Sequence, residues 1–127
     1  MTAFAPDLAA AIADWRAWMQ GERRLAPRYA DGMVAEITGF ARFVGEHHGV
    51  EPSLATLAGL RLGDLRAWQA ARHARGLSAS TRSRGVTALR SFDRFLKRAG
   101  GAGIGGLAGL RPPKVTRPAP RPLEVQQ

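Results

Sequence analysis

Apolar side chains recur every three or four positions in four separate segments of the chain, which is the spacing of an amphipathic helix. No segment shows the alternation of apolar and polar residues that a half-buried strand requires. The pattern therefore predicts an all-α fold. The four predicted helices cover residues 7–20, 27–48, 63–75 and 78–99, the last with Ser78 as its N-cap.

Turn-forming residues support these boundaries. Pro27 suits the first turn of a helix, because the N–H that proline lacks has no acceptor there. Gly49 and Gly76 follow predicted helix ends, where glycine adopts the left-handed conformation at little cost. Between residues 50 and 62 we expect a connector with at most a short helical turn at residues 54–57.

The three tryptophans differ in their expected environments. Trp15 and Trp68 occupy positions on the apolar stripes of their helices, so they are predicted to lie in the core. Trp18 lies at the side of its stripe, and we expect it to be partly exposed.

The composition changes after residue 99. Residues 100–110 contain six glycines and are predicted to form a flexible loop, from which Leu107 and Leu110 can still dock on the core. Residues 111–127 contain five prolines together with basic side chains, which predicts a stiff, extended linker. The predicted organisation is a helical domain at residues 1–99, a glycine-rich loop at 100–110 and a basic proline-rich linker at 111–127.

Length and composition exclude several classes of protein. The chain has 127 residues, enough for one domain with its own core, and its lack of cysteine excludes disulfides and thiolate metal or redox sites. No apolar run reaches the roughly 20 residues that span a bilayer, and the N-terminus lacks a signal-peptide pattern. We therefore expect a cytoplasmic protein without a membrane partner.

The net charge of +9 is distributed unevenly. Residues 1–71 carry 7 basic and 8 acidic side chains, whereas residues 72–127 carry 12 basic and only 2 acidic ones. Arginine, which supplies nearly all of this excess, has a planar fork that matches phosphates and guanine edges. The asymmetry indicates a polyanionic partner. Nucleic acid is the first candidate, and an anionic membrane is the second.

A helical wheel places most of this charge on one side of the last predicted helix. Arginines alternate there with hydroxyl side chains, and Asp93 falls near the apolar edge. Arginine supplies charge to phosphates and can reach base edges, while serine and threonine donate hydrogen bonds to phosphate. The predicted DNA-binding residues are Arg82, Arg84, Arg90, Arg94, Lys97, Arg98, Ser80, Ser83, Thr87 and Ser91, with Arg28 and Arg75 from the neighbouring helices.

Other chemistry has little support in the sequence. His47 and His48 lie near Glu46 and Glu51, but adjacent histidines point to different faces of a helix, and exposed histidines are common at helix ends. No nucleophile with a neighbouring base is found, and nothing beside Tyr29 resembles a general base. We therefore expect no catalytic residue, no cofactor and no metal in this chain.

Several short motifs, taken together in their order, resemble one known family. They are LAPR at residues 25–28, LRAW at 65–68, ARGLS at 74–78, ALRSFDRFL at 88–96, LRPPKV at 110–115 and PRPL at 120–123. The chain resembles the N-terminal core-binding domain of Xer-type tyrosine recombinases over residues 8–123. It departs from the family pattern at Gly85, where a larger side chain is common, and at Asp93, where an aromatic one is.

The resemblance implies a four-helix, SAM-like bundle that grips duplex DNA at a recombination site. Two of its helices, here at residues 27–48 and 78–99, would approach the major groove. Strand cleavage and joining would belong to a C-terminal catalytic domain that these residues do not include. The full-length protein would bind other recombinase protomers. Two alternatives remain: a helical module that binds an acidic protein partner, and an RNA-binding helical domain.

Overall fold

The computed structural model describes residues 3–114, and within them every regular element is a helix. The predicted all-α fold is therefore confirmed. The elements are α1 (Pro6–Gly21), α2 (Pro27–His48), α3 (Leu54–Ala58), α4 (Leu62–Ala74), α5 (Ala79–Arg98) and the short 3-10 helix η1 (Leu107–Gly109).

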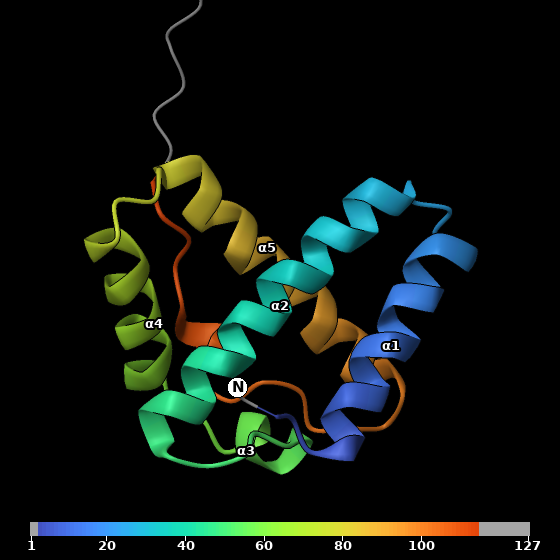
Figure 1. The fold of residues 1–127 in the computed structure, drawn as a ribbon, viewed down its shortest axis with the longest axis horizontal. Coiled ribbons are helices and arrows are strands. Elements are labelled where there is room, and N and C mark those ends of the chain that lie inside the picture. Colours follow the sequence, from blue (N-terminus) through green and yellow to red (C-terminus); the bar gives the residue numbers. More distant parts are fainter. Residues whose placement is uncertain (1–2, 115–127) are drawn as a thin grey trace, which may run out of the picture.

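The two longest helices form the centre of the molecule. α2 and α5 cross each other and pack together more extensively than any other pair, while α1 and α4 lie on opposite sides of the crossing (Figure 1). The short helix α3 lies at the end where α2 finishes and α4 begins. α2 and α5 thus form the frame on which α1 and α4 pack.

The core is built on two aromatic pairs that join different helices. Trp15 of α1 packs against Phe92 of α5 with ring centroids 5.0 Å apart, and Phe40 of α2 meets the edge of Trp68 of α4 at 5.2 Å. Trp15 and Trp68 are 0% and 2% exposed, which confirms their predicted places. Such pairs add about 0.5–1.5 kcal/mol beyond the area they bury.

Helix ends follow the local chemistry that the sequence indicated. Pro27 opens α2, and Gly49 closes it with φ of 66°. Ser78 caps α5 by accepting a hydrogen bond from the backbone N–H of Thr81. The possible helical turn after Ser53 is the helix α3, and Ser53 forms a capping box with Thr56.

The glycine-rich segment after α5 differs from the flexible loop that its composition predicted. Leu107 and Leu110 are buried in the core as predicted, and Ile104 is buried with them. A Cβ atom on Gly105 would lie 2.2 Å from the carbonyl oxygen of Leu60, so only glycine allows the segment to approach this closely. Here the glycines permit tight packing of backbone on backbone rather than freedom of movement.

The chain after η1 passes between α4 and α5 (Figure 1). Gln69 of α4 donates to the carbonyl oxygen of Arg111 at 3.1 Å, and Arg90 of α5 donates to that of Leu110 at 3.2 Å. Most of the predicted proline-rich linker, residues 115–127, lies outside the described residues. None of the helices in the described part is long and apolar enough to cross a membrane.

The two departures from the family pattern have structural reasons. A Cβ atom on Gly85 would lie 3.0 Å from both Trp68 and the Arg72 guanidinium, so glycine lets α4 approach α5 closely. The carboxylate of Asp93 accepts a hydrogen bond from the backbone N–H of Ile104 at 2.8 Å. An aromatic side chain at position 93 could not accept that bond.

Candidate nucleic-acid interface

Helix α5 turns most of its basic and hydroxyl side chains toward solvent. Its opposite side is buried against α1 and α2 through Leu89, Phe92 and Leu96. The hydrogen bond from the backbone N–H of Thr81 to Ser78 Oγ fixes the start of the helix, which in turn sets the direction of every later side chain. Ser80, Arg84, Thr87, Arg90, Arg94, Lys97 and Arg98 are exposed, and Arg82, Ser83 and Ser91 are half-buried.

Two of the exposed cations pair with carboxylates of the protein. Arg84 Nε lies 3.4 Å from Glu36 Oε2, and Lys97 Nζ lies 3.3 Å from Asp93 Oδ2. The sequence predicted a face free of acids with Asp93 near its apolar edge. Asp93 nevertheless reaches Lys97, and the packing of α2 on α5 brings Glu36 to Arg84. The two cations keep 60% and 59% of their side chains exposed, whereas the side chains of Glu36 and Asp93 are only 11% and 12% exposed. When a phosphate draws either cation away, Glu36 retains the Arg72 guanidinium and Asp93 retains the backbone N–H of Ile104.

Two further arginines are held by backbone carbonyls. Arg90 donates to the carbonyl oxygen of Leu110, and Arg82 donates through Nε to that of Leu77 at 3.1 Å. A guanidinium has five N–H donors, so each retains donors for another acceptor. These contacts restrict the side chains without neutralising their charge.

Arg94 and Arg98 complete the charged face. Arg94 is exposed and has no hydrogen bond or ion pair with any residue between 3 and 114. Arg98 lies over the indole ring of Trp18 at 5.2 Å, and Arg23, which follows α1, lies near the same ring at 5.5 Å. Sequence reasoning did not single out Arg23, because only the folded chain brings it close to α5.

Ser91 is turned differently from the prediction of the helical wheel. Its hydroxyl accepts a hydrogen bond from Trp15 Nε1 at 3.2 Å, and the side chain is half-buried between α1 and α5. The wheel placed Ser91 on the outward arc, but α1 covers that part of the arc. The structure therefore gives Ser91 a packing role, which corrects the expectation that it points outward.

Helix α2 contributes basic and aromatic side chains next to the first half of α5. Arg28 and Arg84 line the same surface hollow, together with Tyr29, Gly32 and Met33. Tyr29 is 46% exposed beside the two arginines. The sequence showed no catalytic role for Tyr29 and no hollow, since the partners come from two different helices.

Two arginines at the end of α4, Arg72 and the C-cap residue Arg75, have different environments. Arg75 is exposed at the C-cap, directly before the turn that leads into α5. Arg72 is only 13% exposed and lies 3.1 Å from Glu36 Oε1, while its Nη2 also donates to the carbonyl oxygen of Thr81 at 3.1 Å. Arg72 therefore joins α2, α4 and α5 rather than facing a partner.

Comparison with known proteins agrees with this arrangement. Residues 34–100 match the family model "Phage integrase, N-terminal SAM-like domain". The chain is 45% identical to the tyrosine recombinase XerC of Rhodospirillum centenum over 93% of its own length and 35% of that protein. It is 38% identical to the tyrosine recombinase XerC of Mesorhizobium japonicum and 39% identical to that of Methylobacterium nodulans.

The chain spans 35–38% of the length of these relatives. No solved structure matches it. The family model covers most of α2 and all of α3, α4 and α5, which are the helices that carry nearly all of the charged face. The chain belongs to the family of phage-integrase N-terminal SAM-like domains, in the group of the Xer-type tyrosine recombinases.

Proposed function

We infer that this chain binds duplex DNA as the core-binding domain of a Xer-type, site-specific recombinase. The observation that carries this inference is the exposed basic face of α5, with Arg28 beside it on α2. Six basic side chains lie between residues 82 and 98, and the one acid of that stretch, Asp93, is buried. A face of this composition suits a sugar–phosphate backbone.

Binding would depend on side chains that neutralise phosphates and on hydrogen bonds that position the protein on the DNA backbone. Arg94 is available without giving up a partner among the described residues, and Arg84 would exchange Glu36 for a phosphate. The Thr87 hydroxyl donates to the carbonyl oxygen of Ser83 at 3.2 Å and can turn to donate to phosphate instead. Contacts of this kind fix the register of a protein on DNA, while base edges supply the sequence preference.

Strand breakage and rejoining would belong to another part of such a recombinase. The relatives named tyrosine recombinases are almost three times as long as the segment that this chain matches. Within the residues described, no nucleophile is paired with a base. The role proposed for this chain is therefore to clamp and position DNA, and it would meet other recombinase protomers through the full-length protein.

The test is a mobility-shift titration of the purified chain against three probes: a palindromic duplex, a random duplex and a structured RNA. We expect both duplexes to bind more tightly than RNA, with a logarithmic salt slope of about −0.9 per phosphate contacted. Arg94→Ala should weaken duplex binding, and the matched control Arg66→Ala, which removes the same charge from an exposed position on α4, should not. Preference for RNA, or affinity independent of salt, would contradict the proposal.

A further inference from the structure

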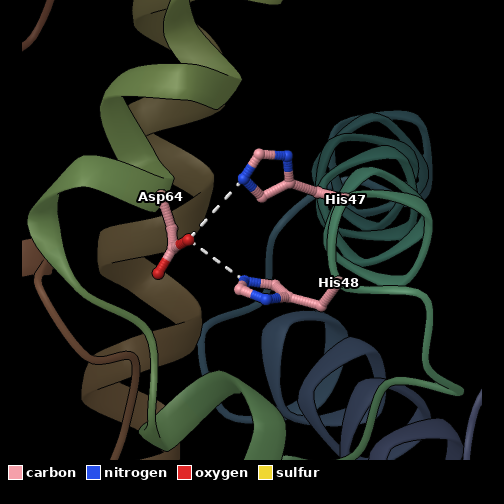
Figure 2. Close-up of side chains that lie close together, drawn as sticks. All are labelled: His47, His48 and Asp64. Carbon is pink, nitrogen blue, oxygen red and sulfur yellow. Dashed lines mark ion pairs between the residues drawn. The ribbon is translucent and has the colours of Figure 1, made fainter.

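Two histidines at the end of α2 and one carboxylate at the start of α4 converge on a single point (Figure 2). His48 Nε2 lies 3.0 Å from Asp64 Oδ1, and His47 Nε2 lies 3.8 Å from the same oxygen. All three atoms lie within 4.8 Å of one another. The sequence favoured histidines on different faces, but the last turn of α2 brings both rings toward α4.

Asp64 and His47 are each held in place by a contact that does not use their convergent atoms. The backbone N–H of Arg61 donates to the other oxygen of Asp64, Oδ2, at 2.8 Å. The His47 ring stacks on Phe43 with centroids 5.1 Å apart and an interplanar angle of 16°. Orientation of ligands by such second contacts is a common property of metal sites in proteins.

The chemistry of these atoms selects one class of ligand. Two imidazole nitrogens and one carboxylate oxygen suit zinc and its neighbours among the divalent transition metals, whereas magnesium and calcium prefer oxygen alone. With neutral histidines the set carries one negative charge. The histidines lie at the C-terminal end of α2, where the helix dipole favours a cation, and Asp64 lies in the first turn of α4, where the dipole favours an anion.

We propose that His47, His48 and Asp64 form a binding site for a divalent transition-metal ion such as zinc. The two Nε2 atoms and the Asp64 carboxylate supply three ligands, and water fills the remaining position because the histidines are about 40% exposed. A metal held there joins the end of α2 directly to the start of α4. Because the two helices are brought together only by folding, the ion binds the folded chain and stabilises it.

The simpler interpretation is an ordinary surface ion pair between His48 and Asp64. The two interpretations differ in what they require of His47, whose Nε2 lies 3.8 Å from the carboxylate and so makes only a weak pair. A metal site needs His47 as much as His48. Loss of zinc binding on removal of either histidine therefore separates a metal site from an ion pair.

The experiment uses the full 127-residue chain without an affinity tag, after treatment with a chelator that is then removed. Zinc chloride is titrated by calorimetry, and thermal unfolding is followed by circular dichroism with and without zinc. The variants are His47→Gln and His48→Gln. The matched control is His73→Gln, which alters the third histidine of the chain, an exposed residue of α4 outside the cluster.

We expect one zinc ion per chain, a rise in Tm with zinc, and at least about a tenfold loss of affinity in each cluster variant, since even indirect contacts to a metal are worth that much. The control should bind as the parent chain does. Asp64→Asn keeps an oxygen for the Arg61 N–H, and it too should lose affinity without losing the fold. Absence of zinc binding, or binding that His47→Gln and His48→Gln leave unchanged, would overturn the proposal.

Discussion

The carboxylate of Asp93 accepts a hydrogen bond from the backbone N–H of Ile104 inside the protein, with a donor–acceptor distance of 2.8 Å. Asp93 is 8% exposed, and its second oxygen pairs with Lys97 at the surface. One side chain thus fastens the glycine-rich segment to α5 and holds the ammonium group of Lys97 beside it. The segment is ordered by a bond to a distant acid, which its own composition does not reveal.

Asp93→Ala is expected to destabilise the fold by about 1–3 kcal/mol, because it leaves the buried N–H of Ile104 without an acceptor. Asp93→Asn keeps an acceptor oxygen and should cost less. Urea unfolding followed by tryptophan fluorescence measures both. If the alanine variant were as stable as the parent chain, the hydrogen bond would not be what holds the segment.

Ser91 and Arg94 lie one turn apart on α5 but should respond to substitution in opposite ways. Ser91→Ala removes the acceptor of Trp15 Nε1 and is expected to lower stability by about 1 kcal/mol while leaving DNA affinity unchanged. Arg94→Ala should change stability by less than about 0.5 kcal/mol but should weaken DNA binding and reduce the salt slope by about 1. Denaturation curves measure the stability of each variant, and mobility shifts on the same preparations measure its DNA affinity. Weaker DNA binding by Ser91→Ala, or a large loss of stability in Arg94→Ala, would contradict the prediction.

Gly105 should not tolerate even a methyl group. Its Cβ atom would lie 2.2 Å from the carbonyl oxygen of Leu60 and 2.5 Å from that of Ala58, and backbone atoms cannot move aside cheaply. We expect Gly105→Ala to cost about 1–3 kcal/mol or more. Gly39→Ala is the control: a Cβ atom added there, inside α2, would meet no other part of the protein within 4 Å, so alanine should stabilise the helix by up to about 1 kcal/mol.

Acidification should reveal the contribution of Asp64. The backbone N–H of Arg61 and the imidazoles of His48 and His47 lower the pKa of Asp64 below its usual value of 3.8. A carboxyl group with a lowered pKa stabilises the folded state above its unfolded pKa, and this contribution is lost as the pH falls through the folded pKa. In buffer with a chelator, the difference in unfolding free energy between the parent chain and Asp64→Asn should shrink as the pH falls from 6 to 2. A difference independent of pH would contradict this.

The helical content of the protein could be predicted from the sequence because its causes are local. The spacing of Leu8, Ile12, Trp15 and Met19 defines the buried stripe of α1, and the structure buries all four. The bounds of α2 agree with Pro27 and Gly49, since capping depends only on neighbouring residues. The charged face of α5 likewise follows from helical periodicity. After the first turn, Ser83 and Ser91 are half-buried, and the other predicted members of the face are exposed: Arg84, Thr87, Arg90, Arg94, Lys97 and Arg98.

The tertiary structure decided what those faces meet. A helical wheel cannot tell that α1 covers Ser91, that Glu36 of α2 reaches Arg84, or that Asp64 of α4 faces His47 and His48. Each of these contacts joins residues from different helices, and their distance depends on how the helices cross rather than on local periodicity. The amino-acid sequence by itself determined the helices and the sign of their charge; the packing of α1, α2 and α4 around α5 decided which side chains remain free to bind.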